Sequence, residues 1–217
     1  MSITYRTKEN IIDAIDHNYA WRFKELKCIK KNIELMSGDA KNTAIRQASL
    51  LLYAHWEGFI KSASISYLQF IVDQKFRQEE LTDNFRGIML RKNYKNAESS
   101  HSIKAHIGAV KAITDGLTAY VIFDPNTQIK TDSNLNYKLF EDILHTLAID
   151  PSPYETKQNQ IDKQLLGRRN EIAHGEKSIP DQKSFFELFE SVLSMIDSFK
   201  TDLQNLCALE RYKKSIG

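Results

Sequence analysis

The chain has 217 residues, with 30 basic and 28 acidic side chains, and its net charge of +2 lacks the excess expected of a protein that holds nucleic acid mainly by charge. The length allows one sizeable domain with a buried core, so any contact with nucleic acid should be local. Cys28 and Cys207 lie far apart and predict neither a disulfide framework nor a zinc site. Apolar runs are short, and the first residues do not resemble a signal sequence, so we expect a cytoplasmic protein without membrane contact.

The N-terminal third is expected to be helical. Glycines and prolines are few, 8 and 4, and apolar residues recur at steps of three and four, which predicts a mostly all-α fold. A first helix is expected over residues 8–36 and a second over about 42–76. The second carries apolar or aromatic residues along its whole length, which predicts the central helix of a bundle. His55 on this helix is interpreted as a core histidine with satisfied hydrogen bonds.

The middle of the chain is less regular. Shorter helical pieces over 81–113 are interrupted by RKNYKNAESSH, residues 91–101, which we interpret as a solvated loop. The segment AYVIFDPNTQIKT, residues 119–131, is compatible with a small β-hairpin. We therefore expect a single domain over 1–217, with a polar helical and loop insertion around 77–132.

The last third is predicted to hold three helices. Ser133 and Asn134 lead into the first of them, which ends before Asp150. The next begins near Gln158 and contains LLGRRNEIAHGEKSIP, residues 165–180, with a stop at Gly175. Ser178 and Pro180 are typical of a helix start, and the last helix is expected to reach about Tyr212.

The segment around residues 165–180 carries the candidate chemistry. Histidine is the side chain best suited to proton exchange near neutral pH, and arginine holds a phosphate through a planar fork. Arg169, Asn170 and His174 therefore indicate phosphodiester chemistry. On an ideal helix of roughly 100° per residue, Asn170 and His174 share a face, whereas Arg169 and His174 lie about 140° apart. Either the helix loosens at Gly175, or a second copy of the segment packs across a two-fold axis.

The specificity of this pattern depends on its extended form. A bare Arg-to-His spacing of this kind arises by chance nearly once in a chain of this composition, whereas Arg, Asn, three residues, His and Gly in order is rare. A purely structural alternative remains: Arg169 would make a salt bridge and His174 would cap the helix. Arg168 offers a second possible spacing to His174, but its neighbour is Arg169 rather than a small polar residue, so Arg169 is preferred.

The sequence RRNEIAHGE resembles the motif of the all-helical HEPN superfamily, in which Arg and a polar residue precede His by a few positions. The likeness extends to YAHWEGFIK at 53–61, SNLN at 133–136 and the long final helix. Over roughly 12–212 the chain looks like a stand-alone prokaryotic HEPN subgroup of candidate nucleases. Many HEPN proteins are metal-independent ribonucleases that act as homodimers with a shared cleft, often as toxins or in defence against phage.

This resemblance implies a helical bundle and an endoribonuclease. His174 would transfer protons, Arg169 would bind the scissile phosphate, and Asn170 would orient these groups or contact the phosphate. The RNA 2′-hydroxyl would be the nucleophile, and no metal or other cofactor would be needed. The implied partners are RNA, a second copy of the chain, and a cognate antitoxin or defence protein. Two alternatives remain: a catalytically inactive HEPN module that binds RNA or a protein, and a purely structural dimeric scaffold.

Overall fold

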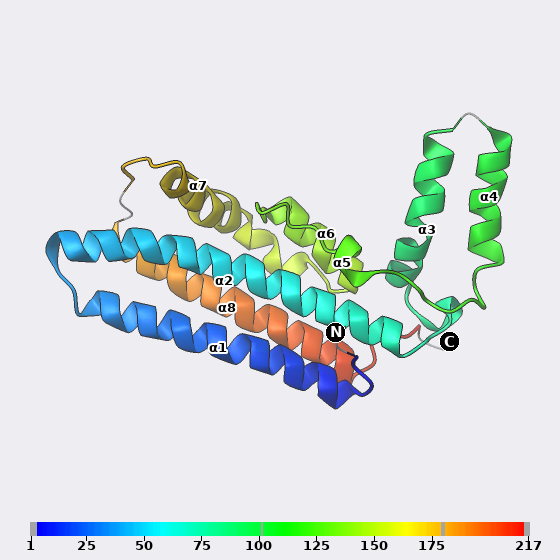
Figure 1. The fold of residues 1–217 in the computed structure, drawn as a ribbon, viewed down its shortest axis with the longest axis horizontal. Coiled ribbons are helices and arrows are strands. Elements are labelled where there is room, and N and C mark those ends of the chain that lie inside the picture. Colours follow the sequence, from blue (N-terminus) through cyan, green and yellow to red (C-terminus); the bar gives the residue numbers. More distant parts are fainter. Residues whose placement is uncertain (1–3, 101, 179–180, 215–217) are drawn as a thin grey trace.

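Three long helices form the body of the molecule. The computed structural model describes residues 4–100, 102–178 and 181–214. Helices α1 (Lys8–Glu34) and α2 (Gly38–Asp73) form an antiparallel hairpin, and α8 (Gln182–Ala208) packs against both (Figure 1). The predicted all-α bundle is confirmed, and the predicted first two helices agree with α1 and α2 to within a few residues at each end.

The helix starts follow from side-chain caps. Thr7 accepts a hydrogen bond from the Asn10 amide at the start of α1, and Asn136 caps α6 (Tyr137–Leu147) in the same way. Asp181 caps α8 by accepting from the Ser184 amide. Such caps satisfy amide groups that have no partner within the helix. Helix α8 therefore begins later than the predicted Ser178, and Pro180 lies outside the described residues.

The core is centred on α2, as predicted. Aromatic rings from three helices meet there: Trp56 lies 5.0 Å from Phe140 of α6, and Phe59 lies 6.3 Å from Phe199 of α8, measured between ring centroids. All four side chains are fully buried. Burying a large apolar side chain stabilises a fold by about 1.5–3 kcal/mol, so this cluster holds α2 firmly against its neighbours. Helix α2 is thus a rigid base for whatever packs on its other faces.

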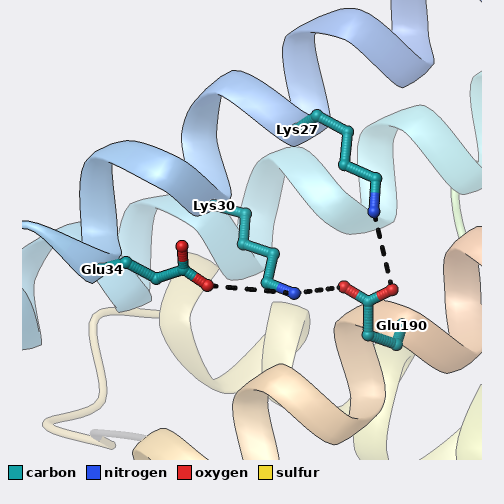
Figure 2. Close-up of polar contacts among 4 residues, drawn as sticks. All are labelled: Lys27, Lys30, Glu34 and Glu190. Atoms are coloured by element: carbon teal, nitrogen blue, oxygen red, sulfur yellow. Dashed lines mark hydrogen bonds and ion pairs between the residues drawn. The ribbon is translucent and has the colours of Figure 1, made fainter.

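Charged side chains join α1 to α8 at the surface. The Lys30 ammonium lies 2.6 Å from Oε1 of Glu190, and Lys27 lies 3.7 Å from Oε2 of the same carboxylate (Figure 2). Lys30 also lies 3.9 Å from Glu34. The hydrogen bond from Lys30 lowers the pKa of Glu190. About half of the Glu190 side chain is exposed, so solvent screens this network and its contribution to stability is small.

The middle of the chain differs from the prediction in two places. Helix α3 (Asp83–Glu98) includes most of the segment 91–101 that was predicted as a loop. Residues 119–131 form no hairpin: Asp124 caps a short helix, α5 (Pro125–Gln128), by accepting from the Asn126 amide. Proline at the first position of a helix is favourable because its φ is already set, and this outweighs the strand-like residues around it.

Helices α3 and α4 (Ile103–Thr114) project from the end of the bundle opposite α7 (Figure 1). They pack together through small residues, and Ala97 and Ala109 are buried between them. The larger side chains of α4 face outward, so that Ile103, Ile107 and Val110 are 71%, 50% and 59% exposed. Both helices lie within 77–132. Their status as an insertion into a single domain over 1–217 stays a prediction.

Shorter elements connect these helices. Within the described residues they are the 3₁₀ helices η1 (Gln78–Glu80) and η2 (Ser152–Lys157), and two isolated antiparallel β-bridges, Arg77 with Tyr120 and Leu81 with Lys213. The η2 turn follows α6 and leads the chain back along α8 towards the segment of interest.

Candidate functional site

The segment singled out by the sequence forms two unlike pieces. Residues Gln160–Gly167 form a π-helix, η3, and α7 (Arg168–Ala173) follows directly. Helix α7 ends at His174, and Gly175 has a φ of +82°, a left-handed conformation that favours glycine. The predicted stop at Gly175 is therefore confirmed. The predicted helix from about Gln158 is confirmed, although wider π turns replace α turns over its first part.

Arg169 is held by contacts on two sides. Its Nη1 donates to Oδ1 of Asn170 at 2.7 Å and to Oδ1 of Asn134 at 3.2 Å, and its Nη2 donates to the Ser133 carbonyl oxygen at 3.1 Å. The guanidinium also lies over the Tyr53 ring, 4.9 Å from its centroid. A guanidinium over an aromatic face is attracted by the ring electrons. The structure thus brings Arg169 and Asn170 together, beside residues from two other parts of the chain.

Two donors of Arg169 are left over. A guanidinium has five N–H groups, and these three hydrogen bonds leave Nε–H and one Nη2–H without a protein partner among the described residues. Arg169 is only partly buried, so solvent or a ligand can reach this part of the molecule. Two adjacent N–H groups match the spacing of two oxygens of a phosphate or a carboxylate.

His174 is exposed and lies at the end of α7. Its backbone amide donates to the Asn170 carbonyl oxygen at 2.9 Å, which closes the helix. Within residues 4–100, 102–178 and 181–214, no hydrogen bond or ion pair joins its ring to Arg169. Among the described residues, the contacts of Arg169 therefore do not include the His174 ring. The helical-wheel expectation that the two side chains point in different directions stays a prediction.

Arg46 of α2 holds the segment that follows His174. Its Nη1 donates to the carbonyl oxygen of Glu176 at 2.8 Å and to that of Ser178. The chain turns sharply at Gly175, so these bonds fix the direction in which it leaves the turn. Helix α2 therefore contacts both the Arg169 and the His174 parts of the site.

The comparison with known families bears on this arrangement. Residues 17–205 match the RiboL-PSP-HEPN family, a stretch that runs from α1 into α8 and includes the whole candidate site. The chain belongs to the RiboL-PSP-HEPN family. It is thus a member of the HEPN superfamily, as its resemblance implied. No curated protein and no solved structure matches this RiboL-PSP-HEPN chain.

The two neighbouring arginines of this RiboL-PSP-HEPN protein take different directions. Nη2 of Arg168 donates to the Ser184 hydroxyl of α8, and its Nη1 is buried without a hydrogen-bond partner within the described residues. Arg169 faces α2 and the 133–134 turn instead. Arg168 is therefore engaged in the contact between α7 and α8, which supports the preference for Arg169 as the phosphate ligand.

Sequence reasoning missed the roles of two residues beside the candidate site, Tyr53 and Arg46. Tyr53 was interpreted as one of the core aromatic residues of the second helix, and its side chain is indeed buried. Its ring also stacks against the Arg169 guanidinium. Burial, with the Glu57 carboxylate nearby, raises the pKa of the Tyr53 hydroxyl well above its usual range. Arg46 had no motif around it. The one available signal was their spacing, because residues seven apart share a helix face.

His55 has the predicted structural role. Its side chain is buried, with Nε2 lying 2.9 Å from Oε2 of Glu25 and Nδ1 lying 3.4 Å from Nη1 of Arg22. Burial lowers the pKa of His55, with Arg22 acting in the same direction and Glu25 opposing it.

This RiboL-PSP-HEPN chain has no helix, within its described residues, that is long and apolar enough to cross a membrane. The same residues contain no group of three acidic, histidine or cysteine side chains placed to hold a metal ion.

Proposed function

We propose that this RiboL-PSP-HEPN protein is an endoribonuclease whose active site combines Arg169 of one protomer with His174 of its partner. The observation that carries the proposal is the separation of the two groups. Arg169 is held against Tyr53 of α2, with two N–H groups that have no partner among the described residues, whereas His174 is exposed at the other end of a short helix. A second copy would supply the missing half of each site.

The reaction follows from the chemistry of these side chains. The 2′-hydroxyl oxygen of the RNA attacks the adjacent phosphorus, and the bond from phosphorus to the 5′-oxygen breaks. His174 takes the proton from the 2′-hydroxyl or gives one to the leaving 5′-oxygen, and solvent water makes the other proton transfer. Arg169 stabilises the charge that develops on the phosphate oxygens, and Asn170 fixes the guanidinium through its 2.7 Å hydrogen bond. The products are a 2′,3′-cyclic phosphate and a 5′-hydroxyl end.

The direct test is RNA cleavage by purified protein in the presence of a chelator. Arg169→Ala and His174→Ala should each lower the rate by about 10²–10⁴, the usual contribution of a proton-transfer group or a charge-stabilising donor. The matched controls are Arg6→Ala and His17→Ala, which remove the same side chains from exposed positions near the N-terminus. Mass spectrometry should detect the cyclic phosphate. Equal cleavage by all four variants would sink the site assignment.

A mixing experiment tests the shared cleft. Arg169→Ala protein and His174→Ala protein are unfolded together, refolded and assayed. If each site takes its arginine and histidine from different protomers, half of the dimers are mixed and each has one intact site, so about a quarter of the wild-type activity returns. No recovery would place both groups in one chain. RNA binding without cleavage by the wild-type protein would favour the non-catalytic HEPN module.

The biological setting is part of the same proposal. The family resemblance supports action as a toxin or in defence against phage, with RNA as substrate and with a cognate antitoxin or defence protein as a further partner. Expression of the wild-type chain should arrest growth of a bacterial host, and expression of His174→Ala should not. Growth arrest by both would separate toxicity from the proposed chemistry.

A further inference from the structure

One face of α2 contacts both halves of the candidate site. Arg46 and Tyr53 are seven residues apart, which places them within about 20° of each other around the helix and about 10 Å apart along it. Arg46 binds the segment after His174, and Tyr53 lies under Arg169. The distance between these two contacts is therefore set by the rise of a single, well-packed helix.

Tyr53 holds Arg169 in two ways. Its ring lies under the guanidinium, and its hydroxyl oxygen accepts a 2.6 Å hydrogen bond from the Leu135 amide. That bond ties α2 to the turn whose Ser133 carbonyl oxygen and Asn134 side chain accept hydrogen bonds from Arg169. Because Tyr53 is buried, its ring has little freedom to move away. The Tyr53 side chain therefore packs against the Arg169 guanidinium and also holds the turn that carries two of its hydrogen-bond acceptors, the Ser133 carbonyl oxygen and the Asn134 side chain.

The turn itself is unusual in its backbone. Asp132 and Ser133 have φ values of +49° and +54°, in the left-handed region that residues other than glycine seldom adopt. Such a conformation persists only where surrounding contacts hold it. The bond from the Leu135 amide to Tyr53 is one of these contacts, and the hydrogen bond from the Asn134 amide to the Thr131 carbonyl oxygen at 2.8 Å is another.

Arg46 has the corresponding role for His174. Residues 176–178 contain no regular secondary structure, and both carbonyl oxygens that Arg46 binds belong to them. Without these bonds, the left-handed turn at Gly175 could leave α7 in other directions. Because His174 is exposed, its position depends on the backbone on either side of it, which Arg46 holds on the C-terminal side.

We propose that Tyr53 and Arg46 are positioning residues, which set from one face of α2 where the Arg169 guanidinium and the segment carrying His174 lie. The kinetic part of this inference rests on the proposed ribonuclease function, whereas the structural part does not. Neither residue touches the reacting atoms, so their effects must pass through Arg169 and His174. Two kinds of experiment follow, and they can fail separately.

The structural part is tested by NMR on protein labelled with ¹³C and ¹⁵N in its arginines, with the Arg169 signals assigned by their loss in Arg169→Lys. Because Arg169 stacks on Tyr53, the Tyr53 ring should shift the side-chain protons of Arg169 upfield. This shift should survive in Tyr53→Phe and disappear in Tyr53→Leu. The matched control is Tyr67→Leu, the same change at another buried tyrosine of α2. An Arg169 spectrum unchanged in Tyr53→Leu would overturn the inference, whether or not the protein cleaves RNA.

The kinetic part is tested with saturating RNA. A misplacement of about 1 Å costs up to 10²-fold, so Tyr53→Leu and Arg46→Met should lower kcat by about 10- to 100-fold with little change in KM. Tyr67→Leu should retain the wild-type kcat per folded molecule, and Arg46→Lys should recover part of the activity lost in Arg46→Met. A residue that only stabilises the fold would change the amount of folded protein and not its kcat.

A double-substitution test separates positioning from stability. If Tyr53 acts through Arg169, Tyr53→Leu should have little further effect on kcat in an Arg169→Lys background. The effects of substitutions at two coupled residues do not add. Full additivity, or a wild-type kcat for Tyr53→Leu, would overturn the inference while leaving the ribonuclease proposal intact. Absence of cleavage by the wild-type protein would instead reject the proposed function, and the NMR result would decide the positioning role alone.

Discussion

On the side of α2 that faces α1, His55 lies buried between Arg22 and Glu25, whereas near the side that faces α7, Arg169 and His174 remain open to solvent. Both regions combine histidine and arginine. In the first, both ring nitrogens of His55 have partners, and Nε of Arg22 donates to Asn18 at 3.0 Å.

In the second region, two N–H groups of Arg169 have no protein partner within the described part of the chain, and His174 is exposed. A polar side chain whose hydrogen bonds are all made within its own chain contributes to the fold. A side chain with donors that have no protein partner can bind a ligand. Residue type alone does not separate the two.

The largest expected effect is on stability. His55→Ala should lower the free energy of unfolding by about 2–3 kcal/mol, because it leaves a cavity and an unpaired neighbour in a buried site. His174→Ala removes an exposed side chain and should change it by less than about 0.5 kcal/mol. Urea unfolding followed by circular dichroism measures both. Equal losses in the two variants would remove the distinction between the two sides of α2.

A second effect is a dependence of stability on pH. Because burial lowers the pKa of His55 in the folded protein, the unfolded chain binds this proton more readily than the folded chain does. Stability is therefore lost as the pH falls below the usual histidine pKa of about 6.5. Between pH 7 and pH 5, wild-type protein should lose more stability than His55→Leu. His174→Ala serves as the control and should follow the wild-type profile; parallel profiles for all three proteins would contradict the assignment.

The smallest effect concerns the exposed charges that join α1 to α8. Glu190→Gln should cost about 0.2–1 kcal/mol at low salt, since the pair that Glu190 forms with Lys30 is half exposed. The cost should largely vanish near 1 M salt, where screening acts over about 3 Å. Glu187→Gln, in a more exposed pair with Lys183, is the control and should have no measurable effect. A salt-independent loss in Glu190→Gln would mean that this carboxylate belongs with the buried polar groups.

The helices of the bundle could be predicted because their signals are local. Apolar spacing and caps such as Thr7 define the first helix, and the predicted range 8–36 is close to the observed Lys8–Glu34. Two local signals misled. Residues 119–131 have strand-like composition, yet Asp124 and Pro125 start a helical turn there, and a polar segment from 91 onward is helical because α4 packs against it.

Only the part of the candidate site that forms a local sequence motif could be predicted. Arg169, Asn170 and His174 stand within six positions of one another, so a motif could reveal them. Tyr53 and Arg46 lie more than 100 positions away, and only the folded chain shows that they contact the same segment. Their roles depend on tertiary contacts, and neither composition nor periodicity records which core tyrosine lies under an arginine.

The π-helix before α7 implies that this part of the chain tolerates substitution better than a change of length. If the π turns of Gln160–Gly167 are kept, deleting one residue there would rotate everything after it by the angle of one helical residue, on the order of 80–100°. Arg169 would then turn away from Tyr53. Exposed side chains such as Lys163 can change without altering that rotation. The number of residues between η2 and α7 therefore determines the direction in which Arg169 points.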